Sequence, residues 1–164
     1  MIGAMARALR LSEDERAHLH YLAGEVPGPP PGLIREVHPG VLHLLDRLDD
    51  TPAMVCDAIQ TVLAWNPMAA ALITDFSRLP LSERNVIWRF FSDETVRARH
   101  DPDGARRFAR NAVAALHAAA ARYPGDAEVG DLVRRLLAAS GEFRARWARR
   151  DVTADHSARK RIHH

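Results

Sequence analysis

The stretch V-C-D-A-I-Q-T-V-L-A-W-N-P-M-A-A-A-L-I-T-D-F, residues 55–76, decides the fold of this chain. Its first half is rich in Val, Ile, Thr and Trp and is interrupted near Asp57 and Gln60, a pattern typical of two short strands or one bulged strand. A helix is predicted from Asn66, because its side chain can accept a hydrogen bond from an orphan backbone N–H and Pro67 needs no donor at the first helical position. The apolar residues that follow recur at helical spacing: Ala69, Leu72, Ile73 and Phe76.

Helices are predicted on both sides of this stretch. Upstream, the apolar residues between Val41 and Leu48 form a wide helical face, which we expect to pack against the β-element beginning near Pro52. Downstream, capping residues and helical periodicity predict five helices. These run from Ser82 to about Phe91, from Asp93 to about His100, from Asp101 to Pro124, from Asp126 to Ala139, and from Glu142 to Arg149.

Length and composition indicate one ordinary globular domain with a short appendage. The chain has 164 residues, of which 47% are hydrophobic and 27% are charged. The formal net charge of +2 does not argue for a polyanion partner. Cys56 is the one cysteine, which excludes an intrachain disulfide. No apolar stretch approaches the roughly 20 residues that span a bilayer, so we expect a soluble, cytoplasmic protein with no membrane partner.

The N-terminal part divides into two predicted segments. Residues 11–24 read as a short helix, in which Ser12 and Glu15 form a capping box. Residues 25–39 carry five prolines, which indicates a semi-rigid connector and a domain boundary. We therefore expect three parts, residues 1–24, residues 25–39 and a globular domain over residues 40–164.

Three segments of the chain show a family resemblance. L-A-W-N-P-M-A-A-A-L at residues 63–72, L-S-E-R-N-V-I-W-R-F-F-S-D-E-T-V-R-A-R at residues 81–99 and S-G-E-F-R-A-R-W-A-R-R-D-V at residues 140–152 follow one another in order. Together they resemble the ligand-binding domain of MmyB-like bacterial transcription regulators. Agreement across several ordered segments is more specific than one short pattern.

This resemblance implies an α+β, PAS-like fold with a small antiparallel sheet flanked by several helices. Residues 1–24 resemble the last helix of a helix-turn-helix DNA-binding domain. The family's C-terminal strands would follow the basic end of this chain, so we expect an incomplete sheet and no specific DNA binding by this chain alone. The expected partners are a small apolar or fatty-acid-like ligand and, in a dimer, a second copy or an intact regulator.

The candidate ligand-binding residues are aromatic, amide and basic side chains. Aromatic groups beside a polar end are the usual form of a small-molecule site, although they can equally be ordinary core. Arginine near a helix start fits an anionic partner, with a surface arginine as the alternative. Asn66 can be a helix cap only. The candidates are Trp65, Asn66, Arg84, Asn85, Trp88, Phe91, Trp147 and Arg150. Arg150 stands where the resembled family has histidine, so a pH-sensitive role is not expected there.

Catalytic and metal chemistry lack a signature in this sequence. There is no H-E-x-x-H, C-x-x-C, G-x-S-x-G, P-loop or G-x-G-x-x-G pattern. We therefore expect no cofactor, no metal and no enzymatic activity. The alternative to a ligand sensor is a helical protein–protein interaction or dimerisation module, in which every aromatic residue belongs to the core.

Overall fold

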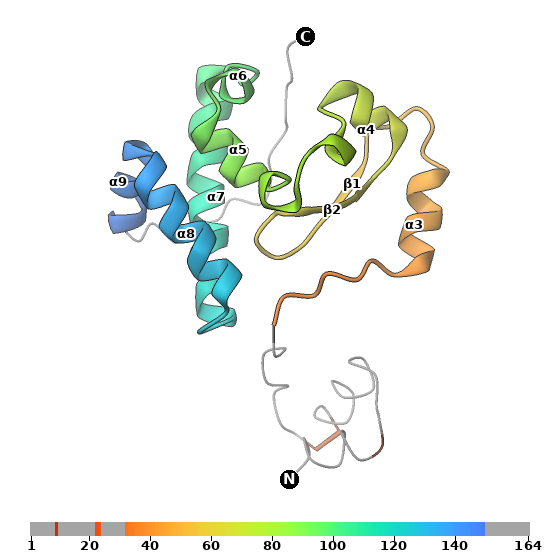
Figure 1. Cartoon of the computed structure of the whole chain (residues 1–164), viewed down its shortest axis with the longest axis horizontal. Helices are drawn as coiled ribbons and strands as arrows, with labels where there is room; N and C mark the ends of the chain where they lie inside the picture. The colour runs from red at the N-terminus through yellow and green to blue at the C-terminus, as the bar shows by residue number, and fades with distance from the viewer. Residues whose placement is uncertain (1–8, 10–21, 24–31, 150–164) are drawn as a thin grey trace. The chain divides into compact units, whose positions relative to one another are not determined.

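A computed structural model describes residues 9, 22, 23 and 32–149 of the chain (Figure 1). The chain divides into two compact units, Met1–Pro31 and Gly32–His164. The elements described below belong to the second unit. The helix predicted over residues 11–24, the first part of the connector, Arg150 and the basic C-terminal stretch lie outside the described residues, so the predicted division into three parts stays a prediction. No helix in the described part is long and apolar enough to cross a membrane.

The β-type run forms an antiparallel hairpin of two short strands, as predicted. Strand β1 spans Met54–Cys56 and β2 spans Val62–Trp65, with an irregular register between Val55 and Cys56. The turn is held by Asp57, whose Oδ1 accepts hydrogen bonds from the backbone N–H groups of Ile59 and Thr61. Gln60 has a φ of 63°, a left-handed conformation that non-glycine residues rarely adopt. The turn is therefore built around one carboxylate.

The predicted passage from strand to helix is confirmed. Helix α4 spans Pro67–Leu72, and Asn66 caps it by accepting a hydrogen bond from the N–H of Ala69. The helix is shorter than its apolar spacing predicts. Phe76 begins a separate 3-10 turn, η1 (Phe76–Arg78), which Asp75 caps through Ser77. A capping aspartate competes with a continuing helix for backbone N–H groups, and this ends α4 early.

The upstream helix buries only part of its predicted apolar face. Helix α3 spans Pro39–Asp46, but Leu45 is its one buried residue. Val41, Leu42 and Leu44 are exposed within the described structure. The periodicity is correct, but periodicity alone does not reveal whether a neighbouring element covers the face.

The remaining helices follow the predicted caps with one correction. The structure has η2 (Leu81–Glu83), α5 (Val86–Ser92), α6 (Glu94–Arg97), α7 (Pro102–Arg122), α8 (Ala127–Ala139) and α9 (Gly141–Arg149). Asp93, Asp101 and Asp126 cap α6, α7 and α8, as predicted. Ser82 was expected to cap the first of these helices, but Asn85 caps α5 instead. The buried amide of Asn85 also bonds the hairpin turn, so tertiary contacts favour the later start.

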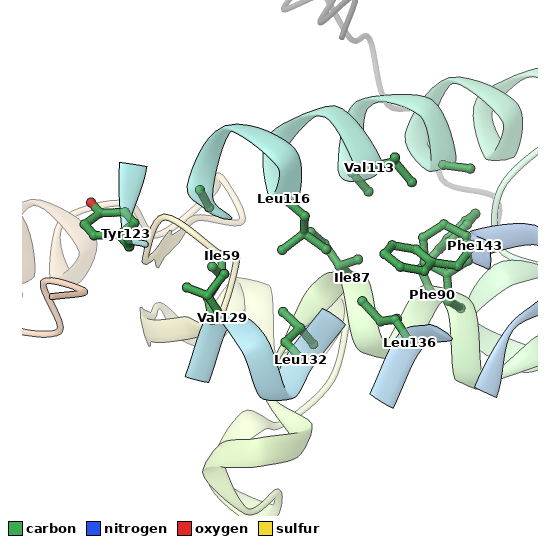
Figure 2. Close-up of a cluster of buried hydrophobic side chains, with 14 of the residues drawn as sticks. Ile59, Ile87, Phe90, Val113, Leu116, Tyr123, Val129, Leu132, Leu136 and Phe143 are labelled. Atoms are coloured by element: carbon green, nitrogen blue, oxygen red, sulfur yellow. The ribbon is translucent and has the colours of Figure 1, made fainter. Parts of the chain in front are cut away.

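The hydrophobic core lies between α5, α7, α8 and α9 (Figures 1 and 2). Small alanines on α7 allow close approach, and larger side chains from the other helices fill the space between them. The labelled residues of Figure 2 show this packing: Ile59, Ile87, Phe90, Val113, Leu116, Tyr123, Val129, Leu132, Leu136 and Phe143. The class is thus α+β, helix-rich with a small open antiparallel sheet, as predicted.

Candidate functional site

An apolar cavity lies between the hairpin side of the domain and the start of the helical layer. Its volume is about 80 Å³. Since roughly 10–15 Å³ suffices for one water molecule, this space admits a small group or the end of an alkyl chain. The lining residues come from several segments between β1 and the end of α6: Met54, Leu72, Ile73, Phe76, Val86, Arg89, Val96, Arg99 and His100.

Local structure places these side chains together. Met54 comes from β1, Leu72 ends α4 and Phe76 begins η1. Val86 and Arg89 lie three apart on α5, so they share one face of that helix. The chain then passes through α6, which contributes Val96, and its exit supplies Arg99 and His100. The site therefore depends on how the hairpin, α4 and α5 meet.

The polar part of the lining is basic. Three of the nine lining residues are Arg or His and none is acidic. Arg99 is exposed and donates a hydrogen bond from Nη1 to the carbonyl of Ile73 at 2.7 Å. Phe76, by contrast, is 1% exposed. The cavity thus combines a buried apolar wall with basic groups that reach the solvent.

Among the described residues, Arg89 forms no ion pair within 4.0 Å, so its positive charge is not paired there. Arg89 has an electrostatic effect on Asp93 at the end of α5. The Thr95 hydroxyl is the largest cause that lowers the pKa of Asp93, and the charge of Arg89 contributes least. Arg89 is only partly buried. It can therefore pair with an anionic group that enters the cavity.

Asn66 and Asn85, both predicted ligand residues, have their side-chain amides occupied by the protein. Asn66 accepts hydrogen bonds from the N–H groups of Ala53 and Ala69, and it donates to the carbonyls of Leu48 and Thr51. These four bonds use the full capacity of an amide.

Asn85 accepts from the N–H of Trp88 and donates to the carbonyl of Ile59 and the hydroxyl of Thr61. Both amides thus position helices whose other residues line the cavity. Asn66 caps α4, which carries Leu72, and Asn85 caps α5, which carries Val86 and Arg89.

Trp65 and Arg84 lie together beside the cavity, but outside its lining. The Cζ of Arg84 is 5.4 Å from the centroid of the Trp65 ring, and its Nε donates to the carbonyl of Leu79. Trp65 in turn contacts the ring of Phe76, with centroids 5.4 Å apart. The pair therefore supports the cavity wall from behind.

The other predicted aromatic residues belong to the helical part. Phe91 is buried and packs edge-on against Phe90 and Phe143. Trp88 packs against the same core, with the guanidinium carbon of Arg135 4.0 Å from its ring centroid.

Trp147 stacks on His117, with ring centroids 3.8 Å apart. These aromatic residues are thus in the core or at its edge and do not line the cavity. Arg150 lies outside the described residues.

None of the nine lining residues is among the candidates from the sequence, and the basic ones that were missed are Arg89, Arg99 and His100. Arg89 carried a signal, because it follows Asn85 by four residues within one of the three family-like segments and so lies above the cap on the same helix face. Arg99 and His100 carried no such signal, because they follow α6, a helix of only four residues. In the described part of the chain, no three His, Cys, Asp or Glu side chains gather in a way that would hold a metal ion.

Comparison with known families agrees with this architecture. The family model described as "MmyB-like transcription regulator ligand binding domain" matches residues 37–164 of the chain. The chain therefore belongs to this family, and its class is that of a regulatory domain that binds a small molecule. Membership points to a regulatory role rather than an enzymatic one. No curated protein and no solved structure matches the chain.

Proposed function

We propose that this chain is the ligand-sensing domain of a bacterial helix-turn-helix transcription regulator, and that it binds a small apolar or fatty-acid-like molecule in the cavity lined by Phe76 and Arg89. One observation carries the proposal. The lining combines apolar side chains with three basic residues and no acidic one. A molecule with an alkyl chain and one carboxylate matches both parts of such a lining.

The carboxylate partner in this proposal is Arg89. Arg89 is a lining residue and forms no ion pair among residues 32–149. Arg84, the arginine favoured by sequence, is instead held by Leu79 and Trp65. A ligand regulates only if it binds two conformations of the protein with different affinity. Cavity residues come from both the hairpin side and the helical side, so filling the cavity favours the conformation in which the two sides are closed around it.

The test uses octanoate as the probe, with binding measured by calorimetry and thermal shift. Arg89→Gln is expected to weaken octanoate binding about tenfold, since a charge-assisted hydrogen bond is worth roughly 1.5 kcal/mol or more. Val96→Phe, which places bulk in the cavity, is expected to abolish it. Arg107→Gln, at an exposed arginine of α7, is the matched control and should bind octanoate like the unmodified chain.

A neutral analogue separates charge from shape. 1-Octanol is expected to bind the unmodified chain and the Arg89→Gln variant equally, because it lacks the carboxylate. If octanoate at millimolar concentration leaves the melting temperature of the unmodified chain unchanged, the proposal is wrong.

A protein–protein interaction module remains the second candidate, favoured by the exposed apolar face of α3. Val41, Leu42 and Leu44 are all exposed there. Under this alternative the chain is a dimer whose mass, measured by light scattering, falls by half in a Leu44→Glu variant. An unchanged mass would remove the support that α3 gives to it.

A further inference from the structure

The segment that enters the domain is attached by an apolar contact of Leu33 with the hydrophobic core and by the ion pairs of one arginine. Residues 32–38 form neither helix nor strand, and Figure 1 shows them running into α3. Arg35 of this segment forms an ion pair with Glu128 in the first turn of α8. Its Nη2 also lies 3.6 Å from Oδ2 of Asp57 in the hairpin turn. Arg35 therefore contacts both sides of the domain at once.

The two carboxylates that face Arg35 differ sharply in exposure. The side chain of Glu128 is 61% exposed, whereas that of Asp57 is 0% exposed. Water can solvate Glu128 when Arg35 leaves, so this pair contributes little. Asp57 Oδ2 has no hydrogen-bond partner, and Arg35 is its ion-pair partner among the described residues. A buried charge without compensation is strongly destabilising, so the Asp57 turn depends on Arg35 being in place.

The same turn is attached to the cavity on both sides. Two residues before Cys56, β1 supplies Met54 to the lining. On the other side, the N–H of Val86 donates to the carbonyl of Gln60 at 2.9 Å, and Val86 is itself a lining residue. A displacement of the cavity walls therefore reaches the Asp57 carboxylate through a few residues of continuous, hydrogen-bonded backbone.

From this arrangement we propose that the Arg35–Asp57 pair couples occupancy of the cavity to docking of residues 32–38 on the ligand-binding domain. The coupling rests on the proposed function, because it assigns a consequence to filling that cavity. A ligand that braces Met54 and Val86 holds the turn in the conformation that presents Asp57 to Arg35. By reciprocity, docking of residues 32–38 strengthens ligand binding by the same factor.

Limited digestion with trypsin measures docking directly, because the protease must capture the Arg35 side chain to cut the bond after it. Asp57→Asn is the test variant, since its amide oxygen can keep the bonds to Ile59 and Thr61 while the charge is lost. The expected result is cleavage after Arg35 at least about 5-fold faster than in the unmodified chain, in line with typical coupling strengths. Cleavage after Arg110, within α7, monitors global unfolding and should not change.

Asp103→Asn is the matched control. It removes one exposed carboxylate of α7 that pairs with Arg106 and does not border the hollow that contains Arg35. We expect it to leave cleavage after Arg35 unchanged. Cleavage as fast as in Asp57→Asn would overturn the proposal, because general charge loss rather than the specific pair would then explain the effect.

Octanoate tests the coupling from the side of the ligand. It is expected to slow cleavage after Arg35 about 5-fold in the unmodified chain, to have little effect in Asp57→Asn, and to bind that variant about 5-fold more weakly. Equal binding to both proteins would refute the coupling and leave the proposed function standing. Absence of binding to either protein would refute the proposed function and the coupling with it.

Discussion

The helical part of the domain and the hairpin part are stabilised in different ways. The helical part, made by α5, α7, α8 and α9, is packed with aromatic and aliphatic side chains (Figure 2). In the hairpin part, buried polar side chains form many of the connections. The four buried polar residues of the described structure all lie between positions 57 and 85: Asp57, Thr61, Asn66 and Asn85.

This difference is consistent with the position of the apolar cavity lined by Phe76 and Arg89. Apolar packing is non-directional and closes empty space, because each void loses van der Waals contacts. Hydrogen bonds fix distances and angles, so they can hold the hairpin and α4 in place without filling the space beside them. The aromatic residues that sequence reasoning assigned to a pocket mostly fill the helical core, whereas this cavity is lined by residues of β1, α4, η1, α5 and the α6 region.

Two phenylalanine truncations test this contrast and have the largest expected effect. Phe143→Ala should lower the free energy of unfolding by about 3–5 kcal/mol, because Phe143 is fully buried in the dense cluster. Phe76→Ala should cost roughly 1 kcal/mol less, although Phe76 is equally buried, because one side of its ring already faces empty space. Urea denaturation of both variants measures the difference.

Removal of an amide has the next largest expected effect. Asn66→Ala leaves two backbone N–H groups and two carbonyls without their partner, and we expect a loss of roughly 2–4 kcal/mol in unfolding free energy. Asn66→Asp keeps the two acceptor bonds and should lose less than Asn66→Ala. Equal stability of Asn66→Ala and the unmodified chain would contradict the view that amides hold the hairpin part.

Removal of an ion pair in the helical part has the smallest expected effect. Glu142 of α9 pairs with Arg97 of α6 at 2.6 Å and with Arg146 at 2.9 Å. Burial raises the pKa of Glu142, but the hydrogen bonds from Arg97 and Arg146 outweigh it, so the pKa is lowered from its ordinary value of 4.5. A carboxylate with a depressed pKa in the folded state stabilises the protein above its unfolded pKa.

The pH dependence follows from this sign. Stability from Glu142 is fully present above about pH 5 and is lost as the pH falls through the folded-state pKa. Melting temperatures measured between about pH 6 and pH 3 should therefore fall less steeply in Glu142→Gln than in the unmodified chain. At neutral pH, the free energies of unfolding of Glu142→Gln and the unmodified chain should differ by no more than about 1 kcal/mol, because the pair is partly exposed. If Glu142→Gln lowered the free energy of unfolding as much as Asn66→Ala does, the proposed difference between the helical part and the hairpin part would be wrong.

The elements were largely predictable from the sequence, because their ends are local. Asn66, Asp101 and Asp126 each cap a helix by bonding N–H groups two or three residues away. The site was much less predictable. Trp65 and Asn66 were correctly placed at the strand-to-helix junction. Arg99 and His100 reach the cavity only because the chain after α6 returns to α4, where Arg99 bonds the carbonyl of Ile73.

The amino-acid sequence by itself determined the hairpin and the order and caps of most helices, since these depend on contacts between near neighbours. It also determined the family, through motifs that follow one another in order along the chain. Tertiary structure alone decided that α3 leaves most of its apolar face exposed and that Phe91 and Trp88 pack into the helical cluster. It also decided that a cavity with apolar and basic lining residues lies beside the hairpin and α4. Periodicity tells which side chains share a face, but only the arrangement of distant segments determines what that face meets.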